Sequence, residues 1–90
     1  MAVKILSAPP PEPEAIAEEM RKAVLAALPG AAVEVEAGSP GHFALSVAST
    51  AFAGLPRVRQ QQKVYAAIAH LMAGDAAPVH AIDRLITKTP

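Results

Sequence analysis

Two short segments of alternating apolar residues, joined by a turn, constrain the fold of this chain more than any other feature. Residues 32–36 have the sequence Ala-Val-Glu-Val-Glu. After a linker at 37–41, the alternation resumes over residues 43–47 as Phe-Ala-Leu-Ser-Val. A period of two is typical of strands with one buried face, and the glycines and proline of the linker are typical of a turn. The sequence therefore predicts two antiparallel strands with one apolar face that other elements must cover.

Helical spacing on both sides of these strands predicts the elements that cover them. Ile16 and Leu28 begin and end a run in which an apolar residue recurs at every fourth position, and Pro13 suits the first turn of such a helix. A second helix is predicted from residue 56 to about residue 73, where a Gly-Asp pair stops it. Its predicted buried stripe consists of Val58, Tyr65, Ile68 and Met72.

A third strand is predicted over residues 79–87, which are rich in β-branched side chains, although Asp83 and Arg84 interrupt the pattern. The expected order is helix, strand, strand, helix, strand, an α+β fold in which a three-stranded sheet has helices packed on one face. A chain of 90 residues suffices for one core and not for two. We expect one domain over residues 13–90, preceded by a flexible, proline-rich N-terminal tail over residues 1–12.

The charge balance and the lack of cysteine exclude several classes of function. Eight basic and eight acidic side chains give no net charge, so no overall field attracts DNA or an anionic membrane. Without cysteine the chain has no disulfide, thiol nucleophile or thiolate metal site of its own. No catalytic motif such as a Ser-His-Asp set or a phosphate loop is present. Since neither a membrane span nor a signal peptide is recognisable, we expect a cytoplasmic protein that is not an enzyme.

Four short motifs resemble the BolA-like family. Ser-Pro-Gly-His-Phe at 39–43 precedes a strand, Phe-Ala-Gly at 52–54 precedes a helix, and Val-His-Ala at 79–81 opens a strand. The run 57–65, Arg-Val-Arg-Gln-Gln-Gln-Lys-Val-Tyr, is similar to the IbaG (YrbA) branch, in which Gln-Gln-x-Val-Tyr stands where other BolA proteins have Arg-His-Arg. The resemblance covers roughly residues 14–90 and implies a class II KH-like fold.

The resemblance also implies a function. Such proteins pair with a monothiol glutaredoxin and share a [2Fe-2S] cluster with it, in iron–sulfur trafficking, iron homeostasis or a stress response. The glutaredoxin contributes a cysteine and a glutathione thiolate, and the BolA partner contributes nitrogen or another ligand. A cysteine-free chain suits this division, because imidazoles can complete a cluster whose thiolates come from elsewhere. For the isolated chain we expect no cofactor.

Two histidines are the candidate metal ligands. His80 matches the C-terminal ligand histidine of the family; taken alone, it would also suit a half-buried histidine bonded to the backbone. His42 is the weaker candidate, because the loop at 37–41 is shorter than in many relatives and lacks the second ligand that they carry there. His42 either substitutes for that ligand or only braces the start of its strand. His70 is predicted to be a solvated helix residue.

Arg57, Arg59 and Lys63 are the predicted contacts with a partner or a phosphate. They gather at the start of the second helix, where positive charge opposes the helix dipole at a cost of roughly 0.3–1 kcal/mol each. Contact with an acidic partner, glutathione or phosphate would offset this cost, and a solvated face is the alternative. The neighbouring glutamines, residues 60–62, would either hydrogen-bond the same partner or point into water.

A nucleic-acid-binding transcriptional regulator with a KH-like fold is the second functional hypothesis. The segment Gly-Ser-Pro-Gly at 38–41 matches the GxxG loop of KH domains, but it joins two predicted strands where theirs joins two helices. Zero net charge and a single tyrosine also argue against strong nucleic-acid binding.

The segment after His80 departs from the pattern of the relatives in two ways. It has one residue more before the Thr-Pro pair, which predicts a β-bulge around Asp83 and Arg84. The further helix that relatives usually add is not in the sequence, so we expect an edge of the sheet to favour a partner or self-association into a homodimer.

Overall fold

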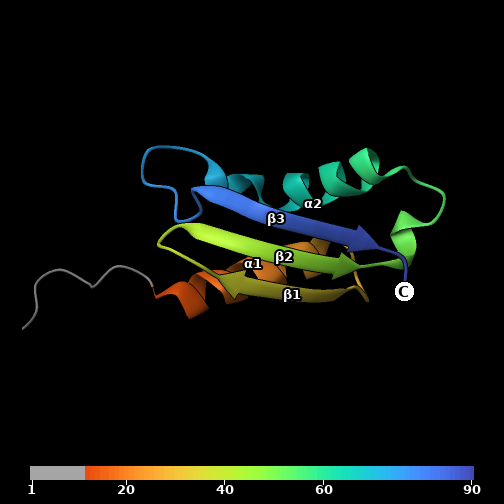
Figure 1. The fold of residues 1–90 in the computed structure, drawn as a ribbon, viewed down its shortest axis with the longest axis horizontal. Coiled ribbons are helices and arrows are strands. Elements are labelled where there is room, and N and C mark those ends of the chain that lie inside the picture. The colour runs from red at the N-terminus through yellow and green to blue at the C-terminus, as the bar shows by residue number, and fades with distance from the viewer. Residues whose placement is uncertain (1–11) are drawn as a thin grey trace, which may run out of the picture.

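The computed structural model describes residues 12–90 and shows two α-helices, a short 3-10 turn and three strands. In chain order these are α1 (Pro13–Ala27), β1 (Ala32–Ala37), β2 (His42–Ala48), η1 (Thr50–Phe52), α2 (Arg57–Met72) and β3 (Ala81–Lys88). The predicted order is confirmed, and both helices lie on the same face of the sheet (Figure 1). The predicted tail lies outside the described residues, apart from Glu12. Within the described range no helix is long and apolar enough to cross a membrane.

The first helix confirms its predicted stripe. Pro13 occupies the first turn, where its missing N–H leaves no intrahelical hydrogen bond unmade. The four apolar residues at every fourth position are all buried: Ile16, Met20, Val24 and Leu28. Because residues four apart lie on one face of a helix, this stripe determines which side of α1 packs on the sheet.

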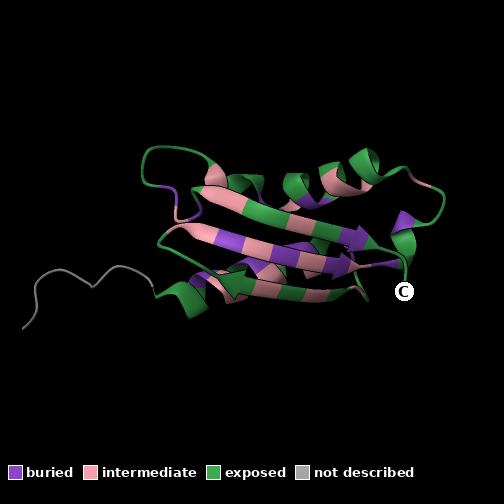
Figure 2. Cartoon of the chain, viewed as in Figure 1, coloured by how far each residue is buried: buried purple, intermediate pink, exposed green. Residues whose placement is uncertain are grey.

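The sheet has the order β1-β2-β3, with β1 antiparallel and β3 parallel to the central strand. Phe43, Leu45 and Val47 are buried along β2, and Figure 2 shows their alternation with less buried residues. In β1, Val33 and Val35 lie opposite two of these residues and extend the inner face. The antiparallel pair and the α+β class are therefore confirmed, as a mixed sheet with two helices on one face.

A β-bulge interrupts the pairing of β2 with β3 at the predicted place. Phe43 lies opposite Ile82. The next residue of β2, Ala44, lies opposite Arg84, so Asp83 is the extra residue of β3. An extra residue bends its strand locally and leaves itself without a partner in the ladder. Asp83 is therefore free to contact side chains that a regular strand would place out of its reach.

The predicted buried stripe of the second helix is wrong. Val58 is 59% exposed and Tyr65 is 40% exposed, so neither belongs to the core. Met72 is half-buried, and of the four predicted residues only Ile68 is fully buried. The buried residues of α2 are Val64, Ile68 and Leu71.

Gln60 explains the error. Its side-chain amide donates to the carbonyl of Leu55 at 2.9 Å, and its side-chain oxygen accepts from the hydroxyl of Thr87 at 2.8 Å. The inner face of α2 therefore begins at a polar residue and continues at the helical spacing through Val64 and Ile68. A stripe counted from apolar residues alone begins at the valine two positions earlier and turns the wrong face of the helix toward the sheet.

The third strand begins later than predicted, at Ala81 and not at residue 79. Val79 is buried, and its N–H donates to the carbonyl of Leu71 in α2 at 3.1 Å. The N–H groups of His80 and Ala81 both donate to the carbonyl of Gly41, at 2.8 and 3.1 Å. The segment ahead of β3 is therefore hydrogen-bonded to the end of α2 and to the β1–β2 turn. This leaves His80 in the connection and not in the strand.

Candidate functional site

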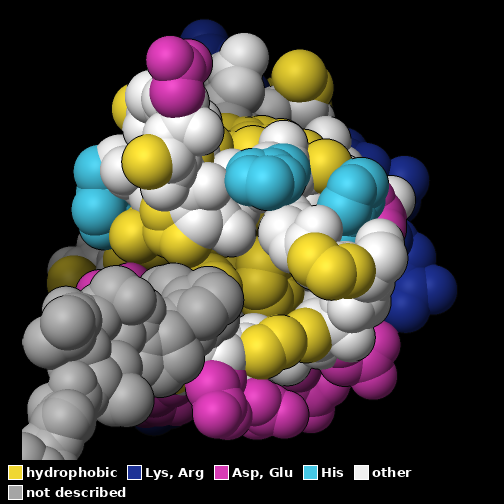
Figure 3. All heavy atoms as spheres, turned by 90° about the vertical axis from the view of Figure 1, so that its left-hand side faces the viewer, with side chains coloured by type: hydrophobic (Ala, Val, Ile, Leu, Met, Phe, Trp, Pro, Cys, Tyr) yellow, Lys and Arg dark blue, Asp and Glu magenta, His cyan; other side chains and the backbone are white. Residues whose placement is uncertain are grey.

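His42 and His80 lie at the same end of the sheet. His42 is the first residue of β2, and in the parallel register it lies opposite Ala81, the residue after His80. Figure 3 shows imidazole rings on the surface at this end of the molecule, where β2 and β3 begin. The parallel pairing of the two strands thus places the two candidate ligands at the same end of the sheet, although they are far apart in the sequence.

His80 is exposed, and its ring lies against Gly41. A Cβ atom on residue 41 would be 2.6 Å from Nδ1 of His80 and 2.7 Å from Cγ, closer than real Cβ atoms approach other atoms. Gly41 also has a φ of +80°, a conformation that favours glycine. The turn between β1 and β2 therefore forms a cradle that glycine leaves open and the His80 imidazole occupies. His80 is therefore not the half-buried histidine of the alternative interpretation.

His42 is held by Asp83, the extra residue of the bulge. The distance between Nδ1 of His42 and Oδ1 of Asp83 is 2.9 Å, and the two side chains are 40% and 56% exposed. An ionised carboxylate only accepts hydrogen bonds, so Nδ1 of His42 is the donor, and in the neutral imidazole Nε2 then keeps a free lone pair. Sequence reasoning misses this contact, although the predicted bulge is the signal that could have found it.

Two exposed imidazoles fit part of the ligand set of a [2Fe-2S] cluster. In mixed centres of this kind two histidines bind one iron and cysteine thiolates bind the other. Residues 12–90 contain no group of three or more His, Asp or Glu side chains placed to hold a metal ion. The donor chemistry of His42 and His80 suits iron, and the cradle at Gly41 holds the ring of His80 at the surface.

An apolar hollow lies beside the turn between β1 and β2, on the side of α1. It has a volume of ≈ 230 Å³ and lies between the start of α1 and the turn between β1 and β2. Its lining residues are Pro13, Ile16, Ala37, Ser39, Pro40, Gly41 and Phe43. Gly41 belongs both to this hollow and to the cradle of His80. An apolar side chain that entered the hollow would therefore contact the same turn that carries the cradle of His80.

The structure does not bring the basic residues to the histidines. Arg57, Arg59 and Lys63 are exposed, and the last two line a hollow of ≈ 330 Å³ with Leu55, Gln62 and Ala66. The reason is that α2 begins at the end of the sheet where β2 ends, which is the far end from the starts of β2 and β3 (Figure 1). Its 16 residues are about 24 Å long. A ligand as small as glutathione that meets the histidines does not reach Arg57.

Two other predicted features have plain structural roles. The segment 38–41 joins β1 to β2 and not two helices, as its pattern predicts, and its last glycine accommodates His80. Gln60 binds the loop before α2 and β3, so its side chain is not free for a partner. His70 is exposed on α2, as predicted.

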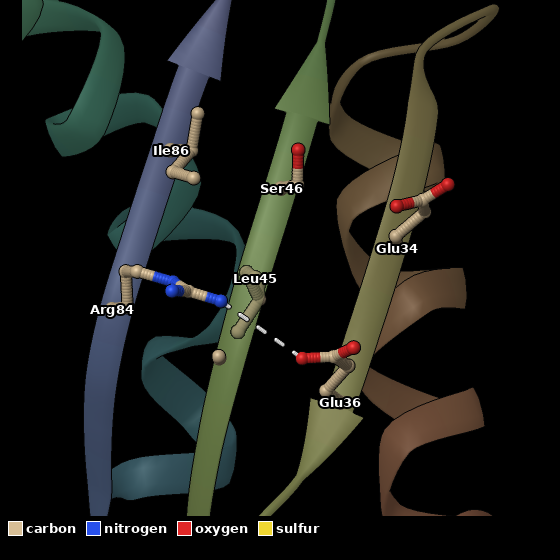
Figure 4. Close-up of a pocket in the computed structure, with 7 residues that line it drawn as sticks. Glu34, Glu36, Leu45, Ser46, Arg84 and Ile86 are labelled. Carbon is tan, nitrogen blue, oxygen red and sulfur yellow. Dashed lines mark ion pairs between the residues drawn. The ribbon is translucent and has the colours of Figure 1, made fainter.

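The open face of the sheet has a polar hollow of ≈ 210 Å³ whose lining includes no histidine. The residues that line it are Glu34, Glu36, Ala44, Leu45, Ser46, Arg84 and Ile86. Figure 4 shows Arg84 reaching across β2 toward Glu36, and Nη2 of the arginine is 4.0 Å from Oε1 of the glutamate. Both side chains are largely exposed. We interpret the contact between Arg84 and Glu36 as a solvated ion pair, and we assign the hollow no catalytic role.

Comparison with known proteins gives a consistent family assignment. The family model described as BolA-like protein matches residues 22–90. The structure of BolA1 from Arabidopsis thaliana is 25% identical with a TM-score of 0.68, covering 82% of this chain and 90% of that chain. A BolA homologue from Coxiella burnetii is 26% identical with a TM-score of 0.66, covering 81% and 88%. Comparison with curated protein sequences gave no match.

A third solved structure adds closer sequence similarity. The XC975 protein is 39% identical, with a TM-score of 0.55, and the match covers 82% of this chain and 88% of that chain. The matched region of the family model contains β1, β2, α2 and β3, together with both candidate histidines. This chain belongs to the BolA-like family.

Proposed function

We propose that this chain is a non-catalytic adaptor that pairs with a monothiol glutaredoxin and supplies nitrogen ligands to a [2Fe-2S] cluster held between the two proteins. The observation that carries the proposal is that His42, the first residue of β2, and His80, just before β3, lie at the same end of the sheet. On the run 57–65, we further propose that the chain belongs to the IbaG (YrbA) branch. Its role would be iron–sulfur trafficking or iron homeostasis.

The division of ligands follows from the side chains that each molecule has. This chain has no cysteine and offers imidazole, so the thiolates come from the glutaredoxin and from glutathione. Replacing thiolate by imidazole raises the reduction potential of such clusters. The bound cluster would supply one-electron redox chemistry, and the protein would hold nitrogen ligands in place for it.

His80 is the principal ligand in this proposal, because the fold presents its ring without burying it. Its backbone N–H is held by the carbonyl of Gly41 at 2.8 Å. Nδ1 and Cγ are the ring atoms nearest to the Cβ position of Gly41, at 2.6 and 2.7 Å, so the edge of the ring that contains Nδ1 lies against the turn. Nε2, the other nitrogen, is then the atom available to iron.

The partner surface would include the apolar hollow beside Gly41. We place glutathione at the histidine end, because its thiolate must reach the same cluster as His80. Arg57, Arg59 and Lys63 lie toward the opposite end of the sheet and would contact a separate acidic surface or a phosphate.

Anaerobic reconstitution tests the proposal. The full chain would be mixed with a monothiol glutaredoxin, glutathione, iron and sulfide, and the visible circular dichroism would be compared with that of the glutaredoxin alone. We expect a distinct spectrum with the wild type that is lost with His80→Ala. His70→Ala removes another exposed histidine and is the matched control, which should keep the wild-type spectrum. A wild-type mixture that shows only the spectrum of the glutaredoxin homodimer would refute the proposal.

A further inference from the structure

The extra residue of β3 is placed to act on a histidine. We infer that Asp83 is a positioning residue that makes His42 the second nitrogen ligand of this chain, through Nε2. The inference rests on the proposed function and deepens it, because the pattern of the sequence leaves the second ligand open.

The bulge is what gives Asp83 this position. Ile82 and Arg84 lie opposite successive residues of β2, so Asp83 between them has no partner in the ladder. Its carboxylate instead meets Nδ1 of His42, with 2.9 Å between Oδ1 and Nδ1. The contact joins the first residue of β2 to the start of β3 and limits the rotation of the imidazole about χ2.

The hydrogen bond also determines which nitrogen can bind a metal. The carboxylate has no proton to donate, so Nδ1 of His42 carries the hydrogen, and in the neutral imidazole Nε2 carries the lone pair. Histidine ligands of metals almost always donate their other N–H to a carboxylate, a carbonyl or water, which fixes the tautomer and raises the basicity of the ligand nitrogen. The His42–Asp83 pair has this arrangement before any metal is bound.

The two histidines are therefore prepared in the same sense by different means. Asp83 contacts Nδ1 of His42. The edge of the His80 ring that contains Nδ1 lies against Gly41. In both rings Nε2 is the nitrogen that remains available. An ordinary surface contact would also bring Asp83 and His42 together, but its removal would leave the lifetime of the cluster unchanged.

Two measurements on the full chain separate these cases. Long-range ¹H–¹⁵N NMR of the imidazoles reports the tautomer of His42 in the isolated protein. The lifetime of the mixed cluster, followed by visible circular dichroism after reconstitution with glutaredoxin and glutathione, reports ligation. The variants are Asp83→Ala, which removes the acceptor, and Asp83→Asn, which keeps an oxygen acceptor. Asp75→Asn is the control, because Asp75 is an exposed residue in the connection before β3.

We expect the wild type and Asp75→Asn to hold His42 with hydrogen on Nδ1, and Asp83→Ala to lose this preference. The cluster lifetime should fall by about 10-fold or more in Asp83→Ala, as is typical when a second-shell partner of a metal ligand is removed. Asp83→Asn should keep part of the tautomer preference of His42 and part of the cluster lifetime. His42→Ala should shorten the cluster lifetime at least as much as Asp83→Ala does.

The possible failures are distinguishable. If the wild type forms no mixed cluster at all, the proposed function fails and the inference about its second ligand fails with it. If the cluster forms but His42 carries its hydrogen on Nε2, or if Asp83→Ala keeps the wild-type lifetime, the inference is overturned while the proposed function stands.

Discussion

The imidazole of His80 occupies the space that a side chain on Gly41 would need, since a Cβ there would be 2.6 Å from Nδ1. The same glycine accepts hydrogen bonds from the N–H groups of His80 and Ala81. One residue of the β1–β2 turn thus holds both the backbone and the ring of the candidate ligand. This relationship connects the stability of the fold to the presentation of the site.

Gly41→Ala should therefore destabilise the protein by more than its φ alone explains. Gly30 is the control, since its φ is +85° and, apart from its own residue and its two chain neighbours, no heavy atom of the described chain lies within 4 Å of its Cβ position. We expect Gly30→Ala to cost about 1–2 kcal/mol of unfolding free energy, and Gly41→Ala to cost about 1–3 kcal/mol more from overpacking. Urea denaturation measures both.

A double-mutant cycle identifies the source of that difference. In the background of His80→Ala the ring is gone and only the Cβ of residue 80 stays close, at 3.1 Å from the Cβ position of Gly41, so most of the extra cost of Gly41→Ala over Gly30→Ala should disappear. Equal costs for the two glycines in the wild-type background would show that the ring is not the obstacle.

The inner face of α2 can be tested with one substitution at two sites. Val64 is fully buried and Val58 is 59% exposed. We expect Val64→Ala to lower the unfolding free energy by about 2 kcal/mol, from two lost methyl groups and the cavity that they leave. Val58→Ala should change it by less than about 0.5 kcal/mol. If chemical denaturation showed a larger loss of unfolding free energy for Val58→Ala than for Val64→Ala, the buried stripe predicted from the sequence would be correct.

Gln60 should be a structural residue and not a partner contact. Its amide satisfies the carbonyl of Leu55 and the hydroxyl of Thr87, and removing it leaves polar groups without partners in a half-buried place. We expect Gln60→Ala to cost about 1–3 kcal/mol in thermal or urea unfolding. The neighbouring exposed Gln62 is the control, and Gln62→Ala should be nearly neutral. A neutral Gln60→Ala would contradict this role.

The ion pair on α1 predicts a small pH effect of known sign. The hydrogen bond from Arg21, with a weaker contribution from the charge of Lys22, lowers the pKa of the Glu18 carboxyl. A lowered pKa in the folded state stabilises the protein above the ordinary glutamate pKa, and the effect is lost as pH falls through the folded value. In an NMR titration, Arg21→Gln should raise the pKa of Glu18 more than Lys22→Gln does. An unchanged titration of Glu18 in Arg21→Gln would contradict the contact.

The apolar pattern predicted α1 and the β1–β2 pair because each of these buried faces is made of apolar residues alone. In α1 every fourth residue from Ile16 is apolar and buried, and in β2 every second residue is. The pattern failed for α2 because the inner face of that helix begins at Gln60, which hydrogen bonds and not hydrophobicity hold inside. A scale of hydrophobicity has no means of finding such a residue.

The sequence predicted the residues of the candidate site but not how they are placed, for a similar reason. A resemblance in sequence was enough to select His80 and His42, but their environments depend on strand register. Asp83 lies 41 residues from His42 in the chain, and the two meet only because the bulge leaves Asp83 out of the ladder. The separation of the histidines from Arg57 likewise follows from where α2 begins relative to the strands.

The central claim is that histidine nitrogen of this chain binds the iron of a shared cluster. The most direct test labels the chain with ¹⁵N-histidine, leaves the glutaredoxin and glutathione unlabelled, and examines the reduced mixed cluster by pulsed electron paramagnetic resonance. We predict strong ¹⁵N hyperfine coupling that His80→Ala abolishes or reduces. A mixed cluster without ¹⁵N coupling, or the spectrum of the glutaredoxin homodimer alone, would contradict the claim.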